Sequence, residues 1–339
     1  MIRVGVIGYG YWGVRLARNF ATAQGSRLTT IVDLDARRQA LAARNHPGTE
    51  VMSDHRDMLR NGDVDLVAIA TPLSSHYPLA MAALDAGRHV LVEKPLAATA
   101  DEALRLIDAA ERSGLTLMVD HTFLYTEAVR KIHELVQSGT LGDIYYFDSV
   151  RVNLGLFQHD TNIVYDLAVH DLAVMDYVLA KAPSVVSATG ARHFDGQAED
   201  VAFLTLFFED SALISHVHVN WLAPVKVRRT LIGGDRKMIV FDDLDPSEKV
   251  KVYDKGVEFV DDPAHIDKML ISYRVGDIWV PNLEIREALQ TMVKELLDCV
   301  TTGTPPVSDG RMGLRVVRSL EAATQSMAER GRPVEIVQE

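Results

Sequence analysis

The chain has 339 residues, of which 47% are hydrophobic and 24% charged, a composition typical of a folded globular protein. This length fits about two domains. The 35 Lys and Arg residues against 47 Asp and Glu give a net charge of −12, without any basic block. Such a charge argues against a nucleic-acid partner and against an anionic membrane surface, but not against small anionic ligands, which respond to local fields.

The single cysteine, Cys299, excludes an intramolecular disulfide and a cysteine metal cluster, and it fits a reducing compartment. The first eight residues, MIRVGVIG, lack the long apolar segment of a signal peptide. No stretch has the roughly 18 apolar residues of a membrane span. We therefore expect a soluble, cytoplasmic protein.

Strands and helices alternate in the first third of the chain. Short β-branched or apolar runs predict strands, and segments with apolar residues at helical spacing predict the helices between them. The strands are expected at 3–7, 28–32, 64–70, 89–92 and 115–119, and the helices at 11–23, 35–45, 76–86 and 101–113. This order predicts a parallel, doubly wound sheet of the Rossmann type over residues 1–121.

The pattern changes near residue 121 and predicts a second domain over residues 122–339. Its helices are expected at 127–136, 163–179, 283–300 and 310–330. Its strands are expected at 143–153, 184–191, 200–208, 212–219, 226–233, 237–241, 249–253, 256–260 and 333–337, with hairpin turns at 209–211 and 254–255. The sequence thus predicts an α/β chain whose C-terminal domain is α+β with a largely antiparallel, open sheet.

A glycine motif, G-x-G-x-x-G, follows the first strand and opens the first helix. Gly8 permits the tight turn, Gly10 lets a pyrophosphate approach the backbone, and Gly13 lets the helix pack on the strand. The helix start at Tyr11 and Trp12 offers free N–H groups to phosphates. The alternative is that these are ordinary turn glycines, but the strand, motif and helix in this order favour a dinucleotide site.

Asp33 ends the second strand, 25 residues after Gly8. An acid there can accept hydrogen bonds from the adenosine ribose and would repel a 2′-phosphate, so we predict NAD and consider NADP the less favoured cofactor. Arg37 and Arg38 lie nearby in the sequence and weaken that preference. Asp33 could otherwise be a helix cap.

Glu93-Lys94-Pro95 follows a buried strand, at the edge where ligands bind in open parallel sheets. As a cation, Lys94 can stabilise the developing alkoxide of an alcohol that is being oxidised, and when partly desolvated it can exchange a proton. A solvated lysine beside a turn proline is an equally open interpretation. Pro95 also allows a cis peptide bond.

The glycine motif, Thr71-Pro72 with His76, and Glu93-Lys94-Pro95 together resemble the glucose-fructose oxidoreductase, inositol dehydrogenase and rhizopine-catabolism (Gfo/Idh/MocA) family. The resemblance covers essentially the whole chain. It implies NAD(P) chemistry on sugars, polyols or their nucleotide derivatives. It also implies cofactor contacts by Thr71, Pro72, His76, Glu93 and Lys94, and an open sheet that forms homodimers or homotetramers.

Asp166 and His170 are four residues apart on a strongly apolar helix and so share one face. A carboxylate beside an imidazole holds its orientation, which suits a general base that removes a hydroxyl proton. From the residues alone, a buried pair that satisfies itself is the simpler interpretation. The family has D-x-x-x-H at the matching place, which makes both residues catalytic candidates. Members differ in whether Lys94 or His170 takes the proton; we expect His170 as base and Lys94 as polariser.

The stretch 150–157 (VRVNLGLF), with Tyr273-Arg274 and Gly276-Asp277, is similar to bacterial dehydrogenases that oxidise C3 of UDP-N-acetylglucosamine or its uronic acid. Tyr125, Arg151 and Asn153, besides Lys94 and His170, are the expected substrate contacts. His216 and His218 share a strand face, but no third ligand is evident, so we predict no metal site.

We therefore predict an NAD-dependent oxidoreductase that oxidises a secondary alcohol of a sugar, with C3 of a nucleotide-linked N-acetylamino sugar or its uronic acid as the expected position. Two alternatives remain open: a free-sugar or inositol dehydrogenase, and a dinucleotide-sensing regulatory protein without turnover.

Overall fold

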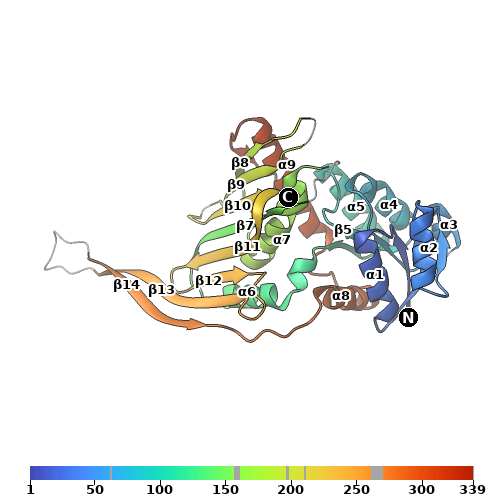
Figure 1. Cartoon of the computed structure of the whole chain (residues 1–339), viewed down its shortest axis with the longest axis horizontal. Coiled ribbons are helices and arrows are strands. Elements are labelled where there is room, and N and C mark those ends of the chain that lie inside the picture. The colour runs from blue at the N-terminus through green and yellow to red at the C-terminus, as the bar shows by residue number, and fades with distance from the viewer. Residues whose placement is uncertain (62, 156–160, 196–197, 210, 261–269, 339) are drawn as a thin grey trace. The chain divides into compact units, whose positions relative to one another are not determined.

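The computed structural model describes the chain except for residues 62, 156–160, 196–197, 210, 261–269 and 339 (Figure 1). Residues 156 and 157 of the stretch that resembles nucleotide-sugar dehydrogenases lie outside the described residues, as does the predicted turn residue 210. The chain forms two compact units. One contains Met1–Thr126 and Arg286–Glu321, and the other contains Glu127–Ile285 and Ala322–Glu339.

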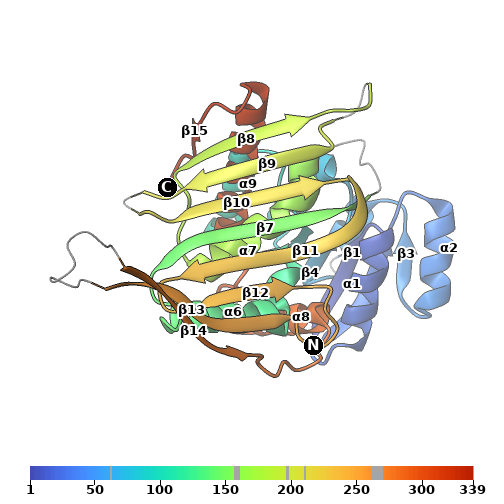
Figure 2. The same ribbon diagram turned by 60° about the vertical axis from the view of Figure 1, so that its left-hand side comes forward.

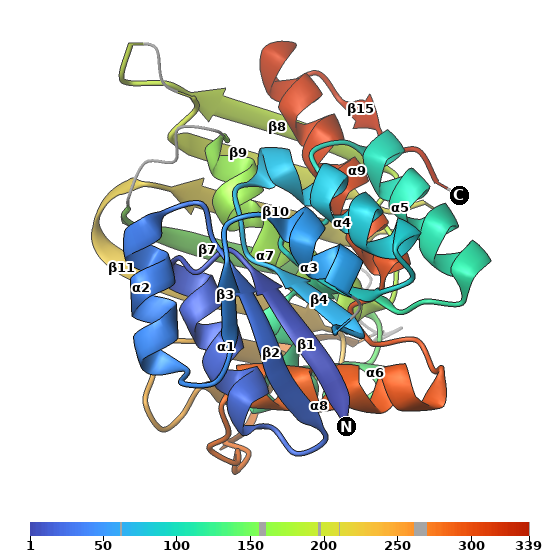
Figure 3. The ribbon, with the colours of Figure 1, turned by 90° about the vertical axis from the view of Figure 1, so that its right-hand side faces the viewer.

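The first unit is built on a six-stranded parallel sheet in the order β3-β2-β1-β4-β5-β6, which confirms the predicted parallel, doubly wound sheet. Figure 3 shows β3, β2, β1 and β4 side by side. The strands are β1 (Ile2–Ile7), β2 (Ser26–Val32), β3 (Glu50–Met52), β4 (Leu66–Ile69), β5 (His89–Glu93) and β6 (Leu117–Asp120). The helices are α1 (Tyr11–Thr22), α2 (Ala36–Asn45), α3 (His55–Asn61), α4 (His76–Asp85) and α5 (Ala100–Ser113), with 3-10 turns η1 (Leu73–Ser75) and η2 (Thr122–Tyr125).

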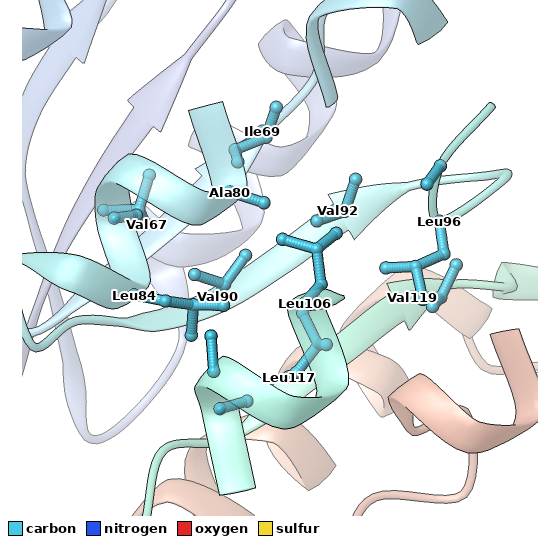
Figure 4. Packing of buried hydrophobic residues seen from close by; sticks show 14 of the residues in the cluster. Val67, Ile69, Ala80, Leu84, Val90, Val92, Leu96, Leu106, Leu117 and Val119 are labelled. Carbon is cyan, nitrogen blue, oxygen red and sulfur yellow. The ribbon is translucent and has the colours of Figure 1, made fainter. Parts of the chain in front are cut away.

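One face of this sheet forms a continuous apolar core with α4 and α5 (Figure 4). Leu84 of α4 and Leu106 of α5 pack on Val90 and Val92 of β5, and both leucines are almost fully buried. Strands that are covered on both faces read as continuous apolar runs, which is why residues 64–70 and 89–92 could be predicted as strands.

Two helices from the C-terminal third also belong to the first unit: α8 (Ala288–Thr302) and the first part of α9 (Gly310–Ala328). Leu314 and Val317 of α9 join the same core cluster. The sequence predicts one domain boundary, near residue 121. The structure instead returns the chain to the first unit at Arg286, because the apolar face of α8 packs on η2 and α1.

The second unit contains a nine-stranded sheet in the order β14-β13-β12-β11-β7-β10-β9-β8-β15 (Figure 2). β7 and β10 run parallel, and the other neighbouring strands are antiparallel. The strands are β7 (Ile144–Leu154), β8 (Val185–Ala191), β9 (Val201–Phe207), β10 (Ile214–Asn220), β11 (Leu222–Gly234), β12 (Met238–Asp242), β13 (Val250–Val260), β14 (Leu270–Trp279) and β15 (Val334–Glu335). Its helices are α6 (Glu127–Gln137), α7 (Val169–Leu179) and a π-helical turn, η3 (Val164–Ala168). No helix within the described residues is long and apolar enough to cross a membrane.

The predicted hairpin around residues 254–255 is wrong, because β13 is one continuous strand. It pairs with β12 on one side and, on the other, with β14, which the sequence did not predict. The pairing shifts register between Tyr253 and Lys255, so the polar residues mark a bulge. Asp254 there accepts a hydrogen bond from Arg274 Nε of β14 over 3.0 Å. The short elements β3 and α3 were also missed.

Candidate active site

The glycine turn between β1 and α1 needs glycine at two positions for steric reasons. Gly8 has a φ of +91°, and a Cβ there would lie 2.3 Å from the carbonyl oxygen of Ala70. A Cβ on Gly13 would lie 1.8 Å from the carbonyl oxygen of Gly8. Glycine at these positions therefore lets α1 start directly against the end of β1.

Gly10 differs from its two neighbours, because the nearest atom to its Cβ position is Arg38 Nη1 at 3.6 Å. No side chain caps the start of α1 at this residue, and Tyr11 and Trp12, its first helical residues, are exposed. An open approach to uncapped helix N–H groups is the geometry that binds a pyrophosphate. The turn thus fits the phosphates of a dinucleotide.

Asp33 lies beside this turn, and its side chain is 6% exposed. Its Oδ2 atom accepts a hydrogen bond from the backbone N–H of Tyr9 over 2.6 Å, and Oδ1 accepts one from Asp35 over 2.9 Å. These bonds fix the carboxylate at the carboxyl end of β2. Arg38 Nη1 lies 3.7 Å from Oδ2, so the acid that would repel a 2′-phosphate has a cation next to it.

His76 connects the ends of β4 and β5. Its ring is 1% exposed, with Nε2 2.9 Å from the carbonyl oxygen of Thr71 and Nδ1 2.8 Å from that of Pro95. Because both ring nitrogens contact backbone carbonyls, His76 holds the loops that carry Thr71, the exposed Pro72 and Lys94.

Lys94 directly follows β5 and is half-buried, and its peptide bond to Pro95 is cis. β1, β4 and β5 are parallel neighbours, so their carboxyl ends meet at one edge of the sheet. The structure therefore brings Gly8, Thr71 and Lys94 to the same edge, where open parallel sheets bind ligands.

The carboxyl group of Glu93, an expected cofactor contact, points into the protein and lies against Asp120 at the end of β6. Burial and the neighbouring acid raise the pKa of Glu93 well above its usual range. Asp120 was not predicted as a site residue; the signal for it is a carboxylate at the end of a buried strand.

In the second unit, Asp166 lies in the π-helical turn η3, and His170 is the second residue of α7. The sequence predicts one α-helix from Ile163, but the structure inserts this turn. The side-chain oxygen of Asn162 accepts hydrogen bonds from the backbone N–H groups of Val164 and Tyr165, over 3.1 Å each. Single π-turns within helices are frequent at functional sites.

Trp221 fixes the carboxylate of Asp166. Its indole N–H donates to Asp166 Oδ2 over 3.0 Å, and its side chain is 1% exposed. No spacing in the sequence pairs these residues, because they are 55 positions apart. His170 is half-buried one helical turn further along.

Arg151, an expected substrate contact, is 6% exposed and forms an ion pair with Asp171, the residue after His170. The Nε to Oδ2 distance is 2.6 Å, and Ser149 Oγ donates to Asp171 Oδ1 over 2.7 Å. The pair joins β7 to α7. Arg151 thus helps to hold α7, and its expected substrate contact stays a prediction. Asn153 lies half-buried two residues further along β7, and its expected substrate contact stays a prediction.

Tyr125 is buried within the first unit. Its hydroxyl lies 3.1 Å from Glu295 Oε1 and 3.0 Å from Ser308 Oγ. Burial and the charge of Glu295 raise the pKa of the phenol above its ordinary value. These contacts join η2 to α8 and to the segment before α9, and the expected substrate contact of Tyr125 stays a prediction.

Comparison with known proteins identifies the family. A family model described as "Oxidoreductase family, NAD-binding Rossmann fold" matches residues 2–121, and one described as "Oxidoreductase family, C-terminal alpha/beta domain" matches residues 133–336. The first unit therefore contains an NAD-binding Rossmann fold, as the glycine turn and Asp33 indicate.

Individual relatives vary in how much of the chain they share. An inositol 2-dehydrogenase of Saccharopolyspora erythraea is 30% identical over 241 residues, which cover 68% of this chain and 71% of the relative. An uncharacterized oxidoreductase of Streptococcus pneumoniae is 26% identical over 62% of this chain, and the match spans only 60% of that relative. The structure of the UDP-N-acetylglucosamine 3-dehydrogenase GnnA from Acidithiobacillus ferrooxidans has a TM-score of 0.81 at 24% identity, over 96% of this chain and 98% of that one. By both family models, the chain belongs to the Gfo/Idh/MocA family of oxidoreductases.

Proposed function

We propose that this protein is an NAD-dependent dehydrogenase that oxidises a secondary alcohol of a sugar, with a nucleotide-linked N-acetylamino sugar or its uronic acid as substrate and C3 as the oxidised carbon. The observation that carries the proposal is Lys94 at the carboxyl end of β5, on the same sheet edge as the glycine turn. A cation at that edge can act on an oxygen beside the cofactor. The likeness to GnnA supports the choice of substrate class.

The residues divide the chemistry between them. The glycine turn and Asp33 would hold NAD, which would supply the acceptor for the hydride of the alcohol carbon. Lys94 stabilises the oxygen as negative charge develops on it, and His170 removes the hydroxyl proton. Asp166 orients His170 and is itself held by Trp221. Gly8, Gly10 and Gly13 position the pyrophosphate. Asp33 accepts hydrogen bonds from the ribose hydroxyls, which favours NAD over NADP.

Replacing Lys94 separates binding from chemistry. In K94M we expect NAD binding, measured by calorimetry, to stay nearly intact, because the glycine turn and Asp33 are unchanged. Turnover should fall by at least about 100-fold, the effect of losing one positioned electrostatic group. The matched control is K131M, which removes a lysine on α6 outside the site. Near wild-type turnover in K94M would remove Lys94 from the mechanism.

A free-sugar or inositol dehydrogenase is the second candidate, and the inositol 2-dehydrogenase of S. erythraea favours it. NADH absorbance with a panel of nucleotide sugars and free polyols distinguishes the two. A sensor without turnover would reduce NAD with none of them and would bind a protein partner only when NAD is present. The presence of Lys94, Asp166 and His170 together favours catalysis over that third candidate.

We further propose a homodimer or homotetramer formed through the nine-stranded sheet, in the cytoplasm. Phe203, Phe207 and Ile214 are each between 41% and 42% exposed. They belong to β9 and β10, which are neighbouring strands of the sheet (Figure 2). Exposed apolar side chains in neighbouring strands are typical of an interface between subunits. Light scattering of the wild type and of F203E/F207E tests this: a monomeric wild type contradicts it. Cell fractionation tests the location.

A further inference from the structure

Two acids occupy equivalent positions on neighbouring strands of the first unit. Glu93 ends β5, Asp120 ends β6, and the two residues are direct partners in the parallel register. Their side chains are 7% and 2% exposed, and they are in contact with each other. Two ionised carboxylates in contact and out of water would repel each other strongly.

The hydrogen bonds of the two acids also argue against two ionised carboxylates. The hydroxyl of Thr122 donates to Asp120 Oδ1. Within the described residues, no donor reaches Glu93 Oε1 or Asp120 Oδ2, although both atoms are buried. An ionised carboxylate only accepts hydrogen bonds, so a contact between two of them satisfies neither. A proton on one of them supplies the missing donor.

We propose that Glu93 and Asp120 hold a single proton between them at neutral pH, carried by Glu93, and that the resulting single negative charge is the counter-charge of Lys94. The hydroxyl of Thr122 stabilises the anion on Asp120, so the proton belongs on Glu93. This arrangement resembles other carboxyl pairs that share one proton because both cannot ionise at short distance.

Lys94 is an ionisable group that acts on both acids and also on His121. His121 follows Asp120, is 2% exposed, and has a pKa of about 3 because of burial and the charge of Lys94. It is therefore neutral, which leaves one anion and one cation at this position. Burial raises the pKa values of both acids, in agreement with a retained proton.

The pair acts on the reaction only through Lys94, so Glu93 and Asp120 are positioning residues. Their role in turnover rests on the proposed function, whereas the shared proton does not. As the counter-charge of Lys94, the pair favours Lys94 as the group that stabilises the oxygen and leaves proton removal to His170. In this proposal Asp120 carries the negative charge that balances Lys94, a role that neither the glycine turn nor the Glu93-Lys94-Pro95 motif assigns to it.

Isotope-edited infrared spectroscopy tests the proton on the intact protein without turnover. At pH 7 ordinary carboxyls, which titrate near about 4, are ionised and give no protonated C=O band. We expect a protonated-carboxyl band that shifts when glutamate is labelled with ¹³C at the side-chain carboxyl. The band should be absent in E93Q and altered or lost in D120N. No such band in the wild type, or an unchanged band in D120N, overturns the shared proton.

Acetylation of Lys94 by acetic anhydride at pH 7, followed by mass spectrometry, tests the counter-charge. E93Q keeps the Asp120 anion and should react like the wild type. E93Q/D120N removes the negative charge of the pair. The fraction of Lys94 present as neutral amine, and with it the acetylation rate, should then rise about 10-fold or more. The matched control, D85N/D108N, removes two exposed acids from α4 and α5. An unchanged rate in E93Q/D120N overturns the counter-charge, and a purely structural role would lower stability without altering that rate.

Discussion

Trp221 donates its indole N–H to Asp166 Oδ2 over 3.0 Å, and this bond connects the junction of β10 and β11 to the π-helical turn before α7. Trp221 is also packed against Gly155, where a Cβ would lie 2.8 Å from its ring. Gly155 directly follows β7, so the Trp221 ring leaves no room for a side chain at the end of that strand. Trp221 fixes the carboxylate that we assign to the orientation of His170.

Replacing Trp221 with Phe removes this hydrogen bond and keeps most of the packing. A hydrogen bond to a charged group contributes about 1.5–3 kcal/mol, so the free energy of unfolding in urea should fall by roughly that amount. Misplacing a catalytic group costs about 10- to 100-fold in rate, and we expect kcat to fall in this range with little change in NAD affinity. W279F is the control, because Trp279 is 48% exposed on β14. Equal kcat values for W221F and the wild type would show that Asp166 needs no such support.

The sequence predicts the first sheet well because its signals are local. Continuous apolar runs gave β4 and β5, and the glycine motif and Asp33 depend on residues next to strand ends. The contacts missed in the second unit join distant positions. Trp221 and Asp166 are 55 residues apart, and Arg151 and Asp171 are 20 apart on different elements.

Two errors have a common physical origin. Asp254-Lys255 has the composition of a turn, but tertiary pairing with β14 turns it into a bulge. In the same way, the apolar run from Ile163 fits an α-helix. The distinct first turn is evident only from the hydrogen bonds that the Asn162 side chain accepts from the N–H groups of Val164 and Tyr165. Local propensity could not decide either case.

Arg151 allows a test between substrate binding and positioning. In R151M the Asp171 carboxylate stays buried without its cation, which should lower the free energy of unfolding by about 3–5 kcal/mol. The double variant R151M/D171L removes both charges and should recover much of this loss. R192M is the matched control, because the Arg192–Glu199 pair is half-exposed on the Arg192 side and should contribute about 1 kcal/mol or less. If R151M were as stable as the wild type and only its KM for the sugar were raised, Arg151 would instead belong to the substrate site.

Gly10 and Gly13 differ in what a methyl group would meet. A Cβ on Gly10 has 3.6 Å to its nearest neighbour, so G10A should keep the wild-type melting temperature and bind NAD at least about 10-fold more weakly. A Cβ on Gly13 would lie 1.8 Å from the Gly8 carbonyl, so G13A should lower the stability of the first unit itself. Calorimetry with NAD and thermal unfolding measure both. Unchanged NAD affinity in G10A would move the pyrophosphate away from the turn.

His121 makes stability depend on acid pH. Its pKa is about 3 in the folded protein, because of burial and the charge of Lys94, against about 6.5 for an unfolded histidine. As the pH falls below 6.5, the unfolded chain takes up a proton that the folded chain refuses, so the contribution of His121 to stability is complete above 6.5 and is lost toward pH 3. Between pH 7 and 4.5 this loss is about 2.5 kcal/mol. In H121Q this proton uptake is absent. We measure the free energy of unfolding of wild type and H121Q in urea at each pH. Between pH 7 and 4.5, the wild type should lose that amount of stability relative to H121Q. A difference that stays constant with pH would mean that His121 becomes protonated in the folded protein, and would remove the neutral histidine from the environment of Glu93 and Asp120.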